Sequence, residues 1–152
     1  MLKIAHPADV ADLIGQELEP SSWVTLDQAM IDGFAEATGD HQWIHVDAAR
    51  AKTEMPGGKT IAHGFLVLSL FPRLSAEITN FENLSKALNY GSDRVRFTNM
   101  VPVGSKVRMR KTFKSVEHLD NGGYKIVADC VMELEGEDRP ALLAEVISLA
   151  FP

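Results

Sequence analysis

One segment of this chain is apolar around most of a helical circumference, and the segments that follow it have the period of β-strands. Between residues 63 and 78 the spacing of the apolar residues is helical, at Phe65, Leu66, Val67, Leu68, Leu70, Phe71, Leu74 and Ile78. A helix that is apolar on nearly every side must be covered on nearly every side. Pro72 lies inside this segment and has no N–H to donate, so we expect a kink near residues 69–72.

The sequence after Leu84 predicts strands only. We expect four long ones, at residues 87–97, 106–116, 124–134 and 141–151. The second and third alternate between apolar and polar residues, whereas the fourth is apolar on both faces and is expected to be covered on both sides. A bulge is expected at Gly91, and Asn121-Gly122-Gly123 predicts a hairpin turn, because Asn-Gly tolerates positive φ angles.

The segments before the apolar helix are shorter. The apolar residues between 7 and 14 are spaced as in a helix, so a short helix is expected there. Residues 23–26 are expected to form a brief strand. Asp27 is a suitable N-cap for a helix that Gly39 would end, and Asp47 can cap another helix over residues 48–53. The order predicts a single α+β domain over residues 1–152, in which an antiparallel sheet wraps around a long central helix.

Charge and cysteine content narrow the functional classes. The net charge of −6 argues against a nucleic-acid-binding protein, which normally has a basic face. The single cysteine, Cys130, excludes an intramolecular disulfide and lies in an apolar run, so we expect a buried, inert thiol. The chain begins without a signal-peptide pattern and has no apolar stretch long enough for a membrane span. We therefore expect a cytoplasmic protein without a membrane or nucleic-acid partner.

A carboxylate and an imidazole lie five residues apart just after the helix-ending glycine. Asp40 and His45 form this pair, and Gly64 opens the apolar helix further along. Together they supply an acid, a base and an unpaired N–H at a helix start, which can polarise a carbonyl and move a proton beside it. Taken singly, Asp40 could be a turn residue and His45 a core histidine, but their joint occurrence with Gly64 favours an enzyme.

These residues resemble a known signature. Phe34-x3-Thr38-Gly39-Asp40-x4-His45-x5-Ala51, with Ala62-His63-Gly64-Phe65 downstream, resembles the MaoC-like, R-specific enoyl-CoA hydratases, which have the hot-dog fold. Gly-Asp-His-Gln-Trp-Ile-His looks most like the NodN-like branch. Most relatives carry Asn-Pro where this chain has Gln42-Trp43, so the loop between Asp40 and His45 must be held differently.

The resemblance implies a reaction and its residues. Asp40 and His45 would hold one water beside the double bond of a trans-2-enoyl thioester, and the N–H of Gly64 would bind the thioester oxygen. Substrate contacts are expected from Gln42, Trp43, Ile44, His63 and Phe65. A CoA or acyl-carrier thioester is then the substrate, and no further cofactor is expected. In this family dimers place the site at a subunit interface, and the apolar last strand suits a homodimer.

Other interpretations use the same residues. A hot-dog thioesterase would need a base aimed at the carbonyl carbon, and a NodN-like protein could bind an acyl thioester without catalysis. His41 and His45 have the spacing of a zinc-protease helix, but Gln42 replaces the required Glu and Gly39 disfavours a helix, so no metal is expected. Gly58-Lys59-Thr60 ends like a phosphate-binding loop without the preceding glycine or strand, so we expect a surface loop.

Overall fold

A five-stranded antiparallel sheet forms the body of the molecule. The computed structural model describes all residues from Met1 to Pro152. The strand order is β2-β5-β6-β7-β4, and every neighbouring pair is antiparallel. Its strands are β2 (Val24–Thr25), β4 (Lys86–Phe97), β5 (Lys106–His118), β6 (Tyr124–Leu134) and β7 (Leu142–Phe151). The four long strands and the short one agree with the sequence prediction.

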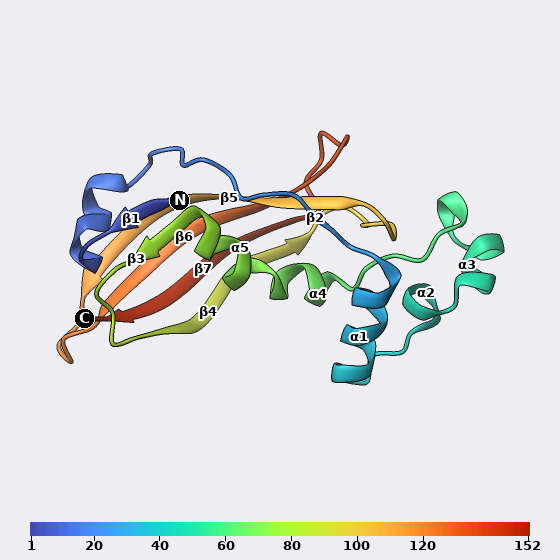
Figure 1. Cartoon of the computed structure of the whole chain (residues 1–152), viewed down its shortest axis with the longest axis horizontal. Helices are drawn as coiled ribbons and strands as arrows, with labels where there is room; N and C mark the ends of the chain where they lie inside the picture. The colour runs from blue at the N-terminus through green and yellow to red at the C-terminus, as the bar shows by residue number, and fades with distance from the viewer.

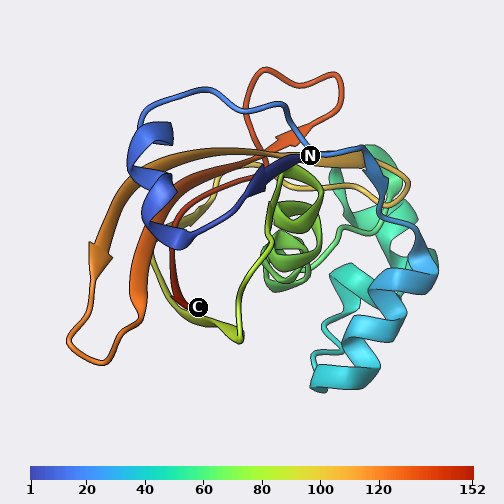
Figure 2. The same cartoon turned by 60° about the vertical axis from the view of Figure 1, so that its left-hand side comes forward.

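The sheet curls around two consecutive helices (Figure 2). These are α4 (Gly64–Ser69) and α5 (Phe71–Ile78), separated at Leu70, with Pro72 in the first turn of α5. The break between the two helices confirms the predicted kink. Pro72 is tolerated in the first turn of α5, because an N–H at that position would have no partner within the helix. The predicted burial on nearly every side is confirmed only in part, because most of the apolar residues are buried but not all of them. Phe65 is 64% exposed and one face of α5 is open.

The core lies between these helices and the concave face of the sheet. Val107, Met109 and Phe113 of β5 are buried there, as their alternation predicts. The inward residues of β6 include the buried Cys130, whose thiol has its pKa raised by burial to about 12, so it is neutral and unreactive. The same alternation also places Lys111 on the inner face of β5, where it is 9% exposed.

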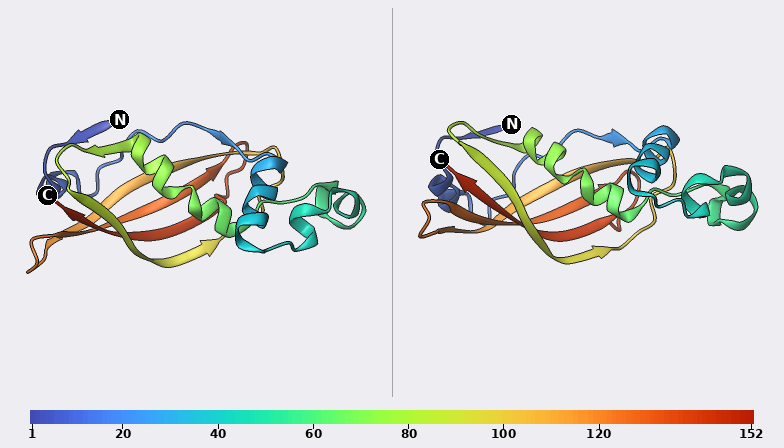
Figure 3. Two further views of the ribbon diagram at one scale, coloured as in Figure 1. Left: turned by 60° about the horizontal axis from the view of Figure 1, so that its bottom comes forward. Right: turned by 90° about the horizontal axis from the view of Figure 1, so that it is seen from below.

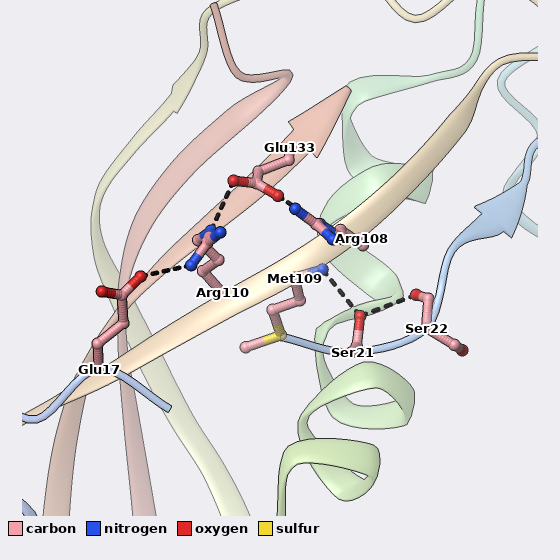
Figure 4. A network of polar contacts seen from close by, with 7 residues as sticks. All are labelled: Glu17, Ser21, Ser22, Arg108, Met109, Arg110 and Glu133. Carbon is pink, nitrogen blue, oxygen red and sulfur yellow. Dashed lines mark hydrogen bonds and ion pairs between the residues drawn. The ribbon is translucent and has the colours of Figure 1, made fainter. Parts of the chain in front are cut away.

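The outer face of β5 and β6 carries an ion-pair network (Figure 4). Glu133 lies directly across from Arg108 and accepts from the Nε–H of both Arg108 and Arg110, and Arg110 also contacts Glu17. Ser21 holds the preceding segment to β5, because its Oγ accepts the Met109 N–H at 2.9 Å. Polar groups therefore cover the face that the helices leave open.

Three further helices lie beyond one end of the sheet (Figures 1 and 3). They are α1 (Gln28–Thr38), α2 (Trp43–Val46) and α3 (Ala48–Glu54), followed by the 3-10 turn η2 (Pro56–Gly58). Asp27 caps α1 by accepting the Met30 N–H at 2.8 Å, as predicted. The segment that carries Asp40 and His45 is thus held outside the sheet and against the start of α4.

Several details differ from the sequence expectation. The N-terminal helix η1 (Pro7–Leu13) has 3-10 geometry, and β1 (Leu2–Ile4) pairs in parallel with β3 (Thr79–Phe81), two strands that local patterning did not indicate. The expected bulge is confirmed, since the β4 register shifts between Asn89 and Gly91. In the hairpin Gly122 has φ +80°, as Asn-Gly predicts.

The last strand is not a free edge. β7 lies between β6 and β4, so its backbone is paired on both sides and cannot extend the sheet into a second subunit. Its residues from 145 to 149 are only half-buried, so the coverage expected on both faces is partial. The long strand with a free edge is β4, and the two-residue β2 forms the opposite edge of the sheet. None of the helices has the length and the apolar character required to cross a lipid bilayer.

Candidate active site

Asp40 follows the point where α1 ends. Gly39 adopts φ +80° there, and its N–H donates to the Ala35 carbonyl at 2.8 Å. A left-handed residue turns the chain sharply away from the helix axis, and glycine does so without Cβ strain. Asp40 comes directly after this turn with an exposed side chain, and its Oδ1 accepts the Gln42 N–H at 3.4 Å.

His45 lies in α2, a single helical turn that the sequence did not predict. Its ring is buried, and Nδ1–H donates to the Ile61 carbonyl at 2.7 Å. A carbonyl can only accept, so Nδ1 carries the proton and Nε2 keeps a lone pair in the neutral ring. Burial has the largest effect and lowers the pKa of His45. The hydrogen bond to Ile61 opposes it, nearby His63 lowers the pKa further, and Asp40 has the smallest effect and raises it. His45 therefore has the properties of a neutral base.

His63 packs directly against His45. The two rings are stacked with centroids 3.8 Å apart and planes 25° apart, and Phe34 lies on His63 at 4.9 Å. The Nε2–H of His63 donates to the backbone carbonyl of Asp40 at 2.9 Å. One side chain thus contacts both His45 and the backbone of Asp40, and the hydrogen bond to Asp40 holds the loop that lacks the usual Asn-Pro. The Nδ1 of His63 is buried without a hydrogen-bond partner.

Two more residues position α2, and sequence reasoning missed both. The side-chain amide of Gln28 donates to the His45 carbonyl at 2.8 Å and accepts from Thr60 Oγ at 2.6 Å. Thr60 is 1% exposed, so the expectation of a surface loop at 58–60 is wrong for this residue. The first turn of a helix is ordinarily exposed, and no local pattern distinguishes Gln28.

Gly64 is the first residue of α4, and its N–H makes no hydrogen bond within the protein. A Cβ at this position would lie 2.7 Å from the Phe97 ring, so only glycine lets the end of β4 approach the helix start. Gly64 and His45 line one pocket of about 370 Å³, together with Phe97 and Arg139. An unpaired donor and a basic nitrogen therefore border the same space.

The other predicted contact residues are not among the residues that line this pocket. Trp43 packs against α3, with the Arg50 guanidinium 4.0 Å from its ring. Gln42 is exposed and Ile44 is half-buried. Phe65 is exposed and meets Phe97 edge-on at 5.6 Å. Their contact with substrate stays a prediction.

Arg139 is a lining residue that the sequence did not single out. It belongs to the turn before β7, and the Asn99 side chain donates to its carbonyl at 3.3 Å. The guanidinium has no acidic partner within ion-pair distance. A free cation at the pocket suits an anionic part of a ligand.

Asp40, His45 and His63 form a cluster that could approach a metal ion. One ligand atom of each lies within 4.8 Å of the others. However, nearly parallel stacked rings direct their lone pairs side by side, whereas tetrahedral coordination needs them to converge. His41 takes no part, because its ring contacts Glu36 at 2.8 Å, away from His45. The cluster fits proton transfer better than metal binding.

Comparison with known proteins agrees with this architecture. The family model of the MaoC like domain matches residues 9–133. The chain is 46% identical to 3-hydroxyacyl-thioester dehydratase Z of Mycobacterium tuberculosis over 140 residues, covering 92% of each chain. It is 45% identical to nodulation protein N of Rhizobium leguminosarum bv. viciae over 143 residues, covering 93% of this chain and 89% of the relative.

A solved structure supports the fold. The R-hydratase PhaJ1 from Pseudomonas aeruginosa superimposes with a TM-score of 0.69 at 21% identity, covering 91% of this chain and 81% of the other. The curled antiparallel sheet around a central helix is the hot-dog arrangement of that structure. With the matching family model and these relatives, the chain belongs to the MaoC-like dehydratase family.

Proposed function

We propose that this protein is an R-specific enoyl-CoA hydratase, which reversibly converts a trans-2-enoyl thioester and water to an R-3-hydroxyacyl thioester. The observation that carries this proposal is the fixed tautomer of His45. Its Nδ1–H is bound to the Ile61 carbonyl, so the remaining nitrogen is free to act as a base near the Asp40 carboxylate, and His45 shares a pocket with Gly64, whose N–H is unpaired. The acyl-thioester chemistry in the name of the mycobacterial relative agrees with this reaction.

The proposed reaction needs one water between Asp40 and His45. Asp40 accepts a hydrogen bond from this water, and His45 Nε2 removes a proton as the oxygen adds to C3. Electrons of the C2–C3 double bond move toward the thioester oxygen, where the Gly64 N–H stabilises the developing charge. The proton then passes from His45 to C2 on the same face. The water has been added across the double bond, and His45 is neutral again.

The acyl group and its carrier require space beyond the reacting atoms. A cavity of about 630 Å³ begins at Leu68 and Ser69, directly after the last α4 residue that lines the catalytic pocket, Val67. We propose that the acyl chain occupies this cavity along the helix. Arg139, at the catalytic pocket, would then bind a phosphate of the CoA or acyl-carrier moiety.

A homodimer is proposed on the basis of the free edge of β4. This strand has no partner on one side, and its exposed apolar residues include Leu88, Tyr90 and Phe97. Exposed apolar strand edges are normally paired or covered. Because Phe97 also lines the catalytic pocket, a second copy at this edge would lie beside the site. Light scattering coupled to size exclusion measures the mass directly, and a monomer at micromolar concentration would contradict this part.

Incubation with crotonyl-CoA tests the reaction. Loss of the enoyl-thioester absorbance without release of free thiol is expected, with mainly the R-3-hydroxy product by chiral analysis. One bound water reaches only one face of the alkene. Predominantly S product would contradict the assignment even if hydration occurred. Free thiol would indicate a hot-dog thioesterase, and an unchanged thioester would indicate a NodN-like protein that binds without catalysis.

A further inference from the structure

The cavity beside α5 is mainly apolar but contains one cationic side chain. Of its 23 lining residues 13 are hydrophobic, and none is an acid. Lys111 is the only cation among them, and it comes from the concave face of β5. Lys111 is therefore an exception in a wall that otherwise suits a hydrocarbon chain.

The ammonium group of Lys111 is bound by neutral groups only. Its Nζ donates to the hydroxyls of Ser75 and Thr79, both at 2.9 Å, and lies 4.6 Å from the centre of the Phe113 ring. No carboxylate lies within ion-pair distance. Burying a charge without a counter-charge is costly, and a valine-like residue would fill the same position without that cost. The arrangement is explained if a ligand supplies the negative charge.

We propose that Lys111 selects acyl groups that carry a carboxylate at the end remote from the thioester, and that this carboxylate binds Lys111 within the cavity. The substrate class would be ω-carboxyacyl thioesters rather than simple fatty acyl thioesters. This inference rests on the proposed function for the position of the thioester at Gly64. The hydroxyls of Ser75 and Thr79 can hold the ammonium in place before the ligand arrives.

The separation along the helix is compatible with such a ligand. Gly64 and Ser75 are eleven residues apart in the sequence, and a rise of 1.5 Å per residue gives roughly 16 Å between the thioester donor and the Lys111 cradle. The cavity follows the helix from Leu68, the residue after Val67 of the catalytic pocket, to Thr79 beside Lys111. Medium- and long-chain acyl groups, rather than crotonyl, have the matching reach.

The titration of Lys111 gives a test that needs no mutation. Burial lowers its pKa to about 8, so the amine is mostly protonated at neutral pH and becomes neutral above that value. The other titratable side chains at the cavity are Cys130 and Tyr90. Cys130 lies opposite Lys111 on β6, and its thiol stays neutral because burial raises its pKa to about 12. Preference for a carboxylate should therefore fall as the pH rises past about 8.

Equilibrium binding of saturated thioesters separates this inference from catalysis. Saturated acyl-CoA has no double bond to hydrate, so calorimetry with matched methyl-ended and ω-carboxylated compounds measures recognition alone. A charge-assisted hydrogen bond in a buried site predicts roughly ten- to a hundredfold tighter binding of the carboxylated compound. Lys111→Met, which keeps the side-chain length, should abolish this preference. Lys114→Met, on the exposed face of the same strand, should retain it.

Each result has one interpretation. Equal binding of the two compounds by the unmodified protein, or an undiminished preference in Lys111→Met or above pH 9, would overturn the role of Lys111. A preference that Lys111→Met removes, in a protein that fails to hydrate crotonyl-CoA and longer enoyl-CoA compounds, would contradict the proposed hydratase and leave the recognition standing. If Lys111→Met does not fold, the pH series on the unmodified protein decides.

Discussion

The imidazole rings of His45 and His63 are stacked 3.8 Å apart, and His63 also donates a hydrogen bond to the backbone carbonyl of Asp40. Through these two contacts His63 fixes the position of a base and of the carboxylate beside it. The same proximity disfavours a second positive charge, so it helps to keep His45 neutral.

Asp40→Asn should lower turnover of crotonyl-CoA by roughly 10²–10⁴-fold, the usual contribution of a positioned acid or base. The side chain is exposed, so the free energy of unfolding should change by less than about 0.5 kcal/mol. Steady-state kinetics and chemical denaturation measure the two effects. Near-normal turnover would remove Asp40 from the mechanism, and a large loss of stability would make its role structural.

The pH profile of kcat/KM should remain flat down to below about 6.5, the ordinary pKa of histidine, because burial lowers the pKa of His45. Below that pH an unfolded chain protonates at this residue before the folded one does. The contribution of neutral His45 to stability is thus present above about pH 6.5 and is lost as the pH falls through the lowered pKa. An acid limb well above pH 6.5 would contradict a neutral, buried base.

His63→Phe should move the acid limb of kcat/KM toward higher pH. A phenyl ring retains stacking but cannot hold a positive charge. The substitution therefore removes the electrostatic effect of His63, which lowers the pKa of His45. It also removes the hydrogen bond to Asp40, so kcat should fall as well. His118→Asn, at the exposed end of β5, is the matched control and should leave the pH profile unchanged. A residue with only a packing role would leave the limb where it is.

Gly64→Ala should lower kcat by roughly 10²–10³-fold, the typical value of one oxyanion donor, although the N–H is retained. The added methyl conflicts with the Phe97 ring at 2.7 Å, so either the ring or the helix start must move. The φ of Gly64 is not positive, so strain in the backbone is not expected. Adding Phe97→Leu should restore part of the activity if the steric conflict is the cause. No recovery would mean that the methyl blocks the thioester itself.

Arg139→Gln should raise KM for crotonyl-CoA about fivefold with kcat unchanged, as expected for loss of one exposed charge interaction. A crotonyl thioester of N-acetylcysteamine lacks phosphates and should show no change. Arg73→Gln, on the open face of α5, serves as the control and should leave both substrates unaffected. Equal effects of Arg139→Gln on both thioesters would indicate a role other than phosphate binding.

Patterns between near neighbours in the sequence gave correct predictions. The alternation in β5 and β6, the kink at Leu70 before Pro72, the Asp27 cap and the Gly39 terminus all appear in the structure. Each depends on hydrogen bonds and side-chain directions within a few residues, which the chain specifies locally. A local pattern also singled out Asp40 and His45 as candidates, and their catalytic roles stay predictions.

The tertiary structure decided which distant residues meet. Strand order placed β4, rather than the apolar last strand, at an edge of the sheet. Long-range contacts placed Gln28 against His45, stacked His63 on the same ring, and enclosed Lys111 between α5 and the sheet. Alternation alone puts Lys111 on the inner face of β5, but only the packed helix supplies its two hydroxyls and removes water. Burial and pairing are properties of the assembled layers, so the sequence determined the local elements, while tertiary packing determined the environment of the candidate residues.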